Sequence, residues 1–345
     1  MPVARWMRRL AIAGFILCFI VVVLGAYVRL TAAGLGCPDW PGCYGQLTPS
    51  GAAGSAHTQA EYASRPLQVG KAWREMIHRY AAGTLALVIL AIAVLAIGAR
   101  RTRLVSVSFA LALLATVIVQ ALLGMLTVTW QLKPLIVTGH LIFGMTTLAL
   151  LWWLVLSLPT STWASAALSA PARSIGGGGA SPLTGAQRLV LLGLAALAVQ
   201  ITLGGWTSSN YAAVACPDFP TCQGKLWPPA DFRDAFVLWR GLNVNYEGGV
   251  LENPARVAIH FTHRLGALVA SLALGLAALY VLRRRALAAA HLRAWAVLAA
   301  LSLQLLIGVS MVLKAFPLPL ATAHTAGAAL LLLATLALLR ALSAR

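Results

Sequence analysis

The chain is built from long apolar runs separated by short polar or basic segments. Eight runs hold about 20 residues each, which at a helical rise of about 1.5 Å per residue is enough to cross the hydrocarbon core of a membrane. They lie near residues 10–30, 75–98, 104–129, 136–158, 187–206, 257–282, 294–314 and 320–340. Because lipid cannot satisfy backbone hydrogen bonds, such runs are expected to be helices. The pattern predicts an all-α membrane protein with eight transmembrane helices.

Composition supports lipid as the solvent of this chain. Of the 345 residues, 60% are hydrophobic and only 10% are charged. A soluble domain carries roughly a quarter charged residues. The sequence is therefore not that of a soluble globular protein.

The charges are separated along the chain, and their net value is +18. Basic clusters lie before, between and after alternate runs: Arg5, Arg8, Arg9, Arg100, Arg101, Arg103, Arg173, Arg188, Arg283, Arg284, Arg285, Arg293, Arg340 and Arg345. All acidic residues fall in or beside the segments after the first and fifth runs. The positive-inside rule then places both termini in the cytoplasm and the two long loops outside. Contact with anionic lipid accounts for the excess charge, so nucleic-acid binding is not expected.

A duplication organises the chain. The pattern C-P-D-aromatic-P-x-C-x-G begins at Cys37 and again at Cys216. Further landmarks recur in the same order: Leu24-Gly25 with Leu203-Gly204, His78-Arg79 with His263-Arg264, Gln120 to Gly124 with Gln304 to Gly308, and His140 with His324. Nearly constant offsets indicate two similar halves, 1–158 and 187–345, joined by a cytoplasmic linker at 159–186. We expect two pseudo-symmetric four-helix bundles.

Four of the five cysteines form two pairs in the predicted outer loops. Cys37 with Cys43, and Cys216 with Cys222, are each separated by five residues. A local disulfide suits an oxidising outer face and is the preferred interpretation. A labile redox role and metal binding stay open as alternatives, although metal sites usually add further Cys or His ligands. Cys18, inside the first run, is interpreted as a small apolar residue.

Histidines at membrane depth carry the functional signal. His78 and His140 are 62 residues apart, and His263 and His324 are 61 apart, each near the outer end of an even-numbered run. Ionisable side chains are costly there and indicate function. Two ligands per half are too few for zinc, whereas a heme takes two axial ligands and fits a helix bundle. The spacing favours one bis-histidine heme in each half. Proton relay, another metal and a purely structural role are the alternatives.

One position breaks the symmetry of the halves. Glu75 precedes His78 by three residues, and His260 stands in the same relation to His263. A spacing of three residues puts each pair on one helix face. The Glu75 carboxylate could act on protons or orient a substrate, or it could be structural. Arg79 and Arg264 are candidates for heme-propionate contacts, with interfacial anchoring as the alternative.

These motifs together resemble bacterial heme A synthases. The resemblance lies in the G-L-G-C-P-D-W-P-x-C segment from Gly34 to Cys43, in E-x-x-H-R from Glu75, and in the four histidines, and it covers nearly the whole chain apart from the linker. It implies a membrane oxidoreductase that converts the C8 methyl of heme O into the formyl group of heme A, for use by terminal oxidases. It also implies a bacterial plasma-membrane location and heme O synthase as an upstream partner. The electron donor is left open.

The same resemblance assigns roles to the two halves. It implies that the first half binds the substrate heme through His78 and His140, with Glu75 as the catalytic carboxylate. It implies that the second half holds heme b as a cofactor through His263 and His324. Since two histidine ligands leave no open site on an iron, one ligand of the substrate heme is expected to leave during turnover.

Two other functions fit parts of the pattern. A di-heme b-type cytochrome that passes electrons without altering its hemes would share the four histidines, but it would not need Glu75. A heme transporter would explain the duplication, but the sequence has no matching pair of broken helices. The second outer loop, from Gln223 to Arg256, is longer than the first and contains Trp227, Trp239 and Tyr246. Its expected role is interfacial anchoring or a lid.

Overall fold

Eight long helices dominate the computed structural model, which describes residues 2–55, 60–63, 65–102, 104–158 and 183–343. Within the described residues, eight helices are long and apolar enough to span a membrane. They are α1 (Pro2–Leu30), α4 (Val69–Gly98), α5 (Val107–Thr129), α6 (Pro134–Ser157), α8 (Gly185–Ser209), α10 (Asn253–Leu282), α11 (His291–Leu313) and α12 (Leu318–Ser343). The short elements are α2 (Pro49–Ala53), α9 (Phe232–Ala235), η1 (Arg100–Thr102), η2 (Ala213–Ala215) and η3 (Arg285–Ala290). The prediction of an eight-helix membrane protein is confirmed.

Several helices extend past the apolar runs that predicted them. α4 begins at Val69, six residues before the expected start, and α10 begins at Asn253 rather than near residue 257. Apolar runs mark only the lipid-embedded part of a helix, whereas hydrogen bonding continues until a cap or turn ends it. The extra turns at the starts of α4 and α10 matter because they carry residues that pack beneath the long loops. Most of the predicted linker, 159–182, lies outside the described residues.

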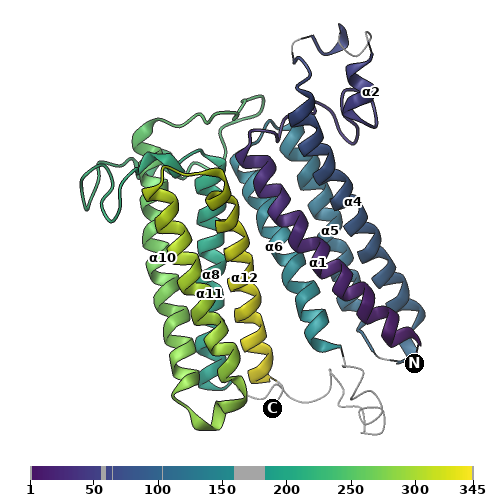
Figure 1. Cartoon of the computed structure of the whole chain (residues 1–345), viewed down its shortest axis with the longest axis vertical. Helices are drawn as coiled ribbons and strands as arrows, with labels where there is room; N and C mark the ends of the chain where they lie inside the picture. Colours follow the sequence, from purple (N-terminus) through teal and green to yellow (C-terminus); the bar gives the residue numbers. More distant parts are fainter. Residues whose placement is uncertain (1, 56–59, 64, 103, 159–182, 344–345) are drawn as a thin grey trace.

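The long helices form two groups of four that lie side by side (Figure 1). One group contains α1, α4, α5 and α6, and the other contains α8, α10, α11 and α12. In the first group α1 packs on α4 and α5 on α6, and in the second α8 packs on α10 and α11 on α12. Both chain ends lie at one end of the bundles, which we label the inner end, and α2 and the long loops lie at the other, which we label the outer end (Figure 1). This arrangement agrees with the expected pair of four-helix bundles.

The outward faces of the helices are apolar. On α10 the exposed side chains Leu265, Leu268, Val269, Leu272 and Leu276 follow the three- and four-residue spacing of one helix face. A stripe of this kind would aggregate in water, but it is the ordinary surface of a helix in lipid. The exposed surface therefore supports the membrane assignment independently of helix length.

Helices from the two halves pack directly against each other. α6 packs on α8 and α12, and α1 packs on α12. Near the inner end, Trp152 Nε1 donates to the Leu333 carbonyl at 3.0 Å. Near the outer end, Arg29 Nη2 donates to the Ser208 carbonyl at 2.9 Å, and its guanidinium lies 4.1 Å from the centre of the Tyr211 ring. Polar contacts thus connect the two halves at both ends of their interface.

The long outer loop of the second half reaches across to the first half. Lys133 of the α5–α6 turn is 2% exposed, donates through Nζ to the Gly241 carbonyl at 2.5 Å, and lies 3.2 Å from the centre of the Trp239 ring. The backbone N–H of Tyr246 donates to the Gln131 carbonyl at 3.1 Å. We call the contacts of Lys133, Trp239 and Tyr246 the inter-half clamp. Two of the loop's unexplained aromatic residues therefore join the halves.

Candidate functional site: a carboxylate and paired histidines

The two outer loops that carry the cysteine pairs are folded in the same way. Cys37 is bonded to Cys43, and Cys216 to Cys222. The second cysteine of each pair exchanges backbone hydrogen bonds with a residue three positions later, Gln46 or Lys225. The disulfide interpretation of both pairs agrees with the structure.

The aspartate of each motif organises the turn that directly follows the disulfide ring. Asp39 accepts hydrogen bonds from the backbone N–H groups of Tyr44 and Gly45, at 2.5 and 2.9 Å. Asp218 accepts from those of Gln223 and Gly224, at 2.6 and 2.9 Å. Gly45 and Gly224 have φ of +70° and +73°, a region that strongly favours glycine. The spacing D-x5-G in the motif is thus a turn with its own acceptor.

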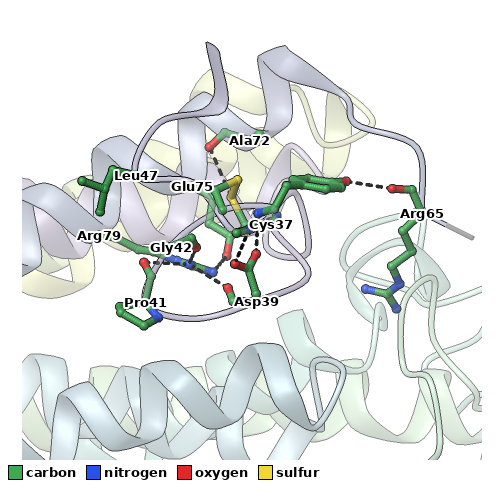
Figure 2. The surroundings of a disulfide bond; sticks show 12 residues. Cys37, Asp39, Pro41, Gly42, Leu47, Arg65, Ala72, Glu75 and Arg79 are labelled. Atoms are coloured by element: carbon green, nitrogen blue, oxygen red, sulfur yellow. Dashed lines mark hydrogen bonds and ion pairs between the residues drawn. A yellow bond between two sulfur atoms is a disulfide. The ribbon is translucent and has the colours of Figure 1, made fainter. Parts of the chain in front are cut away.

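Glu75 fixes the first loop to α4. Its side chain is 4% exposed, and Oε2 accepts a hydrogen bond from the backbone N–H of Cys37 at 2.9 Å. Oε1 pairs with Arg79 Nη2 at 2.5 Å. The loop comes close to the helix because Gly36 has no side chain; a Cβ there would lie 2.8 Å from the Lys71 carbonyl. Figure 2 shows Glu75 beside the disulfide.

Arg79 joins this carboxylate to the rest of the loop. Its Nη1 donates to the carbonyls of Asp39 and Gly42, at 2.9 and 2.5 Å (Figure 2). The guanidinium is therefore held by one carboxylate and by the loop backbone. A buried carboxylate with a guanidinium on one oxygen and a backbone donor on the other is fixed in position.

The second half repeats this arrangement without the carboxylate. His260 is 5% exposed, and Arg264 Nε donates to its Nε2 at 3.3 Å. Arg264 donates to the carbonyls of Thr221 and Cys216, at 2.7 and 2.9 Å, much as Arg79 does in the first loop. The loop, the arginine and the helix are preserved, and the acidic group alone has been replaced by an imidazole.

Each of the four paired histidines lies against a glycine of a neighbouring helix. A Cβ built on Gly25 of α1 would be 3.1 Å from His78 Cε1, and one on Gly124 of α5 would be 3.2 Å from His140 Cε1. The corresponding distances are 3.2 Å from Gly204 to His263 and 3.0 Å from Gly308 to His324. The glycines mark where the imidazoles fit between helices. Sequence reasoning used them only as landmarks of the duplication.

The ring nitrogens of these histidines are poorly satisfied by the protein. In the described part of the chain, the buried Nδ1 atoms of His78, His140 and His324 have no hydrogen-bond partner. No cluster of three or more potential metal ligands occurs in that part of the chain. Buried polar atoms normally have partners, so imidazoles with free nitrogens fit a group that supplies its own metal. A heme, which needs two axial ligands per half, matches this donor set.

Fold and site together define a duplicated eight-helix membrane protein with a pair of half-buried histidines in each half and, among the described residues, a buried carboxylate in the first half alone. The chain belongs to the COX15-CtaA family of cytochrome oxidase assembly proteins, whose model matches residues 8–336.

Curated relatives agree with this family. The chain is 38% identical over 331 residues to the heme A synthase of Shewanella oneidensis, covering 95% of this chain and 93% of that protein. It is 28% identical over 358 residues to the heme A synthase of a Chelativorans species, covering 95% and 88%. A partial match, 35% identical over 191 residues, links it to the heme A synthase of Paracoccus denitrificans.

Proposed function

We propose that the chain acts as a heme A synthase and oxidises the C8 methyl group of heme O to the formyl group of heme A. The family assignment and the full-length similarity to a heme A synthase support the reaction. The observation that carries the proposal is a difference between the halves. In the first half Glu75 binds the loop backbone and Arg79, and at the equivalent position of the second half His260 binds Arg264. The first half thus has a carboxylate at this position, and the second half has an imidazole.

In this proposal the first half is the substrate half. His78 and His140 hold the iron of heme O. The methyl carbon would be oxidised by four electrons in two successive hydroxylations to a gem-diol, with an external oxidant such as dioxygen accepting the electrons, and loss of water from the gem-diol would give the formyl group. Glu75 accepts a proton from a substrate hydroxyl, while Arg79 stabilises the charged carboxylate and the Cys37 N–H fixes its orientation.

The second half holds heme b as a resident cofactor through His263 and His324. A bound heme of this kind supplies one-electron transfer. His260, which is paired with Arg264, provides no carboxylate beside that site. Arg79 and Arg264 lie one residue from His78 and His263, so each is placed to approach a propionate with any donor that the loop carbonyls leave free.

The proposed location is a bacterial plasma membrane with both termini in the cytoplasm. Both chain ends and the turn at Arg285–Ala290 lie at the end of the bundles opposite the long loops (Figure 1). With the chain ends in the cytoplasm, the basic clusters of the sequence fall on the cytoplasmic side and the acidic residues fall outside, as the positive-inside rule requires. Labelling of cysteines introduced at Leu292 and at Glu247 tests it, because only the second should react with an impermeant reagent from outside. Heme O synthase is proposed as the upstream partner that supplies the substrate.

Chromatography of extracted hemes tests the function. The chain is co-expressed with a source of heme O in cells that lack heme A, and heme A or its hydroxylated precursor is expected to appear. If only heme b and unchanged heme O are recovered from a protein with a bis-histidine spectrum, the electron-transfer cytochrome becomes the better assignment.

A further inference from the structure

Three of the four histidine sites share a second feature, a glutamine one helical turn before the glycine. Gln120, Gln200 and Gln304 precede Gly124, Gly204 and Gly308 by four residues each. Gln200 Nε2 lies 3.1 Å from His263 Nδ1, and Gln304 Nε2 lies 3.4 Å from His324 Nε2. The amides of Gln200 and Gln304 therefore lie beside their histidines, and Gln120 holds the matching position before Gly124.

Each glutamine also needs a glycine on the histidine's own helix. A Cβ on Gly266 would lie 2.4 Å from Gln200 Oε1, one on Gly327 2.2 Å from Gln304 Oε1, and one on Gly144 3.0 Å from Gln120 Nε2. These glycines follow their histidines by three or four residues. The glutamine thus occupies a notch in the next helix, and a side chain in the notch would exclude it.

The fourth site, at His78, lacks both parts of this device. Val21 stands four residues before Gly25, and Ala81 stands three residues after His78. Gly25 contacts His78, and Gly14 contacts Val88, so the antiparallel register of α1 and α4 places Val21 opposite the turn that holds Ala81. In the equivalent helix pair of the second half, the same two positions are Gln200 and Gly266. The duplicated halves have therefore diverged at both members of a contacting pair.

This difference has a consequence for metal binding. An imidazole that gives Nε2 to iron carries a hydrogen on Nδ1, and an acceptor for that hydrogen orients the ring and strengthens the ligand. In the described chain, the buried Oε1 atoms of Gln120, Gln200 and Gln304 have no hydrogen-bond partner. The Nε2 end of the Gln200 amide faces His263 Nδ1, so a half-turn of that amide would bring Oε1 to the nitrogen as its acceptor. A valine offers no such group. The Nδ1 atoms of His78, His140 and His324 all lack a hydrogen-bond partner among the described residues, so the difference at His78 is the neighbouring side chain, which is Val21 instead of a glutamine.

We propose that His78 is the exchangeable ligand of the substrate heme and that His140 remains bound. Release of the His78 imidazole, which would keep its electron pair, would open one coordination position on the bound iron. That position lies on the face of α4 that also carries Glu75, one helical turn away. This inference rests on the proposed function, because it takes the first half as the substrate site.

Carbon monoxide is a suitable probe, since it binds ferrous heme only where a position is open. The full-length protein, loaded with heme O, is reduced and titrated with carbon monoxide, and heme content is measured by extraction. We expect the heme of the first half to bind carbon monoxide. The double variant Val21→Gln/Ala81→Gly should keep its heme O and bind carbon monoxide about 10- to 100-fold more weakly, the range typical of groups that support a metal ligand.

The matched control makes the opposite change in the second half. Gln200→Val/Gly266→Ala should make the heme of that half reactive toward carbon monoxide, with the first half unaffected. Removing the two ligands one at a time gives a further comparison. The His78→Ala variant should retain heme O, which should bind carbon monoxide, and the His140→Ala variant should lose its heme O.

The outcomes separate the two hypotheses. Unchanged carbon monoxide affinity in Val21→Gln/Ala81→Gly, at equal heme content, overturns the exchange of His78. Loss of heme O from His78→Ala with retention in His140→Ala also overturns it and exchanges the roles of the ligands. If neither His78→Ala nor His140→Ala alters the heme O content, the first half is not the substrate site, and the proposed function fails instead.

Discussion

At the scale of single residues, the chemistry of each half depends on the side chain three residues before the first histidine of its pair. Glu75 and His260 occupy equivalent positions, and each contacts the arginine one turn later on its own helix. The first pair is an ion pair of opposite charges, and the second is an arginine beside an imidazole. A carboxylate can accept a proton and remain paired, whereas a protonated imidazole next to a guanidinium would be repelled. Proton transfer is therefore expected in the first half only.

Replacing Glu75 by Gln should stop formyl formation while the protein keeps the heme of its second half. The amide keeps the size of the side chain and an acceptor for the Cys37 N–H, but it cannot take a proton at neutral pH. Heme extraction and chromatography should show heme O without heme A. Glu252→Gln, at an exposed position at the start of α10, is the control and should give the unaltered yield. A normal heme A yield from Glu75→Gln would remove the catalytic role.

The glycine beside His263 should be needed for heme binding in the second half. Val at position 204 would place its methyl groups against the imidazole, because even a Cβ is within 3.2 Å of His263 Cε1. We expect a loss of heme b affinity of about tenfold or more, measured by absorbance per protein. Gly275→Val is the matched control, since no atom lies within 4 Å of a Cβ at that position. Equal heme content in both variants would contradict the assignment of His263.

At the scale of elements, the cysteine loops are turns built around an aspartate. The hydroxyl of Thr221, together with the backbone N–H groups of Gly224 and Gln223, holds the pKa of Asp218 at about 2, below its usual 3.8. Since the folded pKa is the lower one, the carboxylate stabilises the loop above about pH 4, and this stabilisation is lost as the pH falls through about 2.

Asp218→Asn should therefore loosen the second loop at neutral pH and have little effect near pH 2. An amide has one acceptor oxygen, and its NH2 group faces a backbone donor. Hydrogen exchange at Gln223 and Gly224, corrected for the intrinsic rate, should be several-fold faster in the variant at pH 7. The first loop, around Asp39, is the internal control and should not change. Equal protection at pH 7 would show that the carboxylate does not support the turn.

Elements also show which parts of the molecule could be predicted from the sequence. Eight apolar runs and a repeated C-P-D motif were sufficient for the helices, the duplication and the cysteine pairs, because those signals are local or periodic. The outer ends of α4 and α10 were missed because helical hydrogen bonding continues beyond the apolar segment. The role of Gln200 was missed because its partners, His263 and Gly266, are on another helix more than 60 residues away. The contacts of Trp239 were missed for the same reason, since Lys133 is in the other half.

At the scale of the whole molecule, the halves are joined by direct contacts as well as by the linker. The inter-half clamp at the outer end combines a buried ammonium group that donates to a backbone carbonyl, an aromatic ring and one backbone–backbone hydrogen bond. Arg29 and Tyr211 add a second contact near the same end. Together they connect the first half to the second half at this end.

Removing the clamp should weaken the association of the halves. Trp239→Ala deletes a ring in close contact with a desolvated cation, a contact worth about 2 kcal/mol. With a protease site placed in the Gly176–Gly179 segment, the halves of the parent protein should co-purify after cleavage. The double variant Lys133→Ala/Trp239→Ala should release one half at lower detergent or denaturant concentration. Trp227→Ala, which removes a ring that contacts Phe261 of its own half, is the control and should leave the association unchanged.

Each half crosses the membrane four times, so its two ends return to the same side (Figure 1). Two copies of such a unit can be fused in tandem by a short hydrophilic segment, without an additional span and without inverting either copy. A self-associating four-helix ancestor would have carried two identical reaction centres, and any change in one would have appeared in both. Gene fusion removes that constraint: one copy can keep the acid while the other specialises in holding its metal. The two halves of this chain are unequal in this sense, because they differ at positions 21, 75 and 81 and at the counterparts of those positions in the second half.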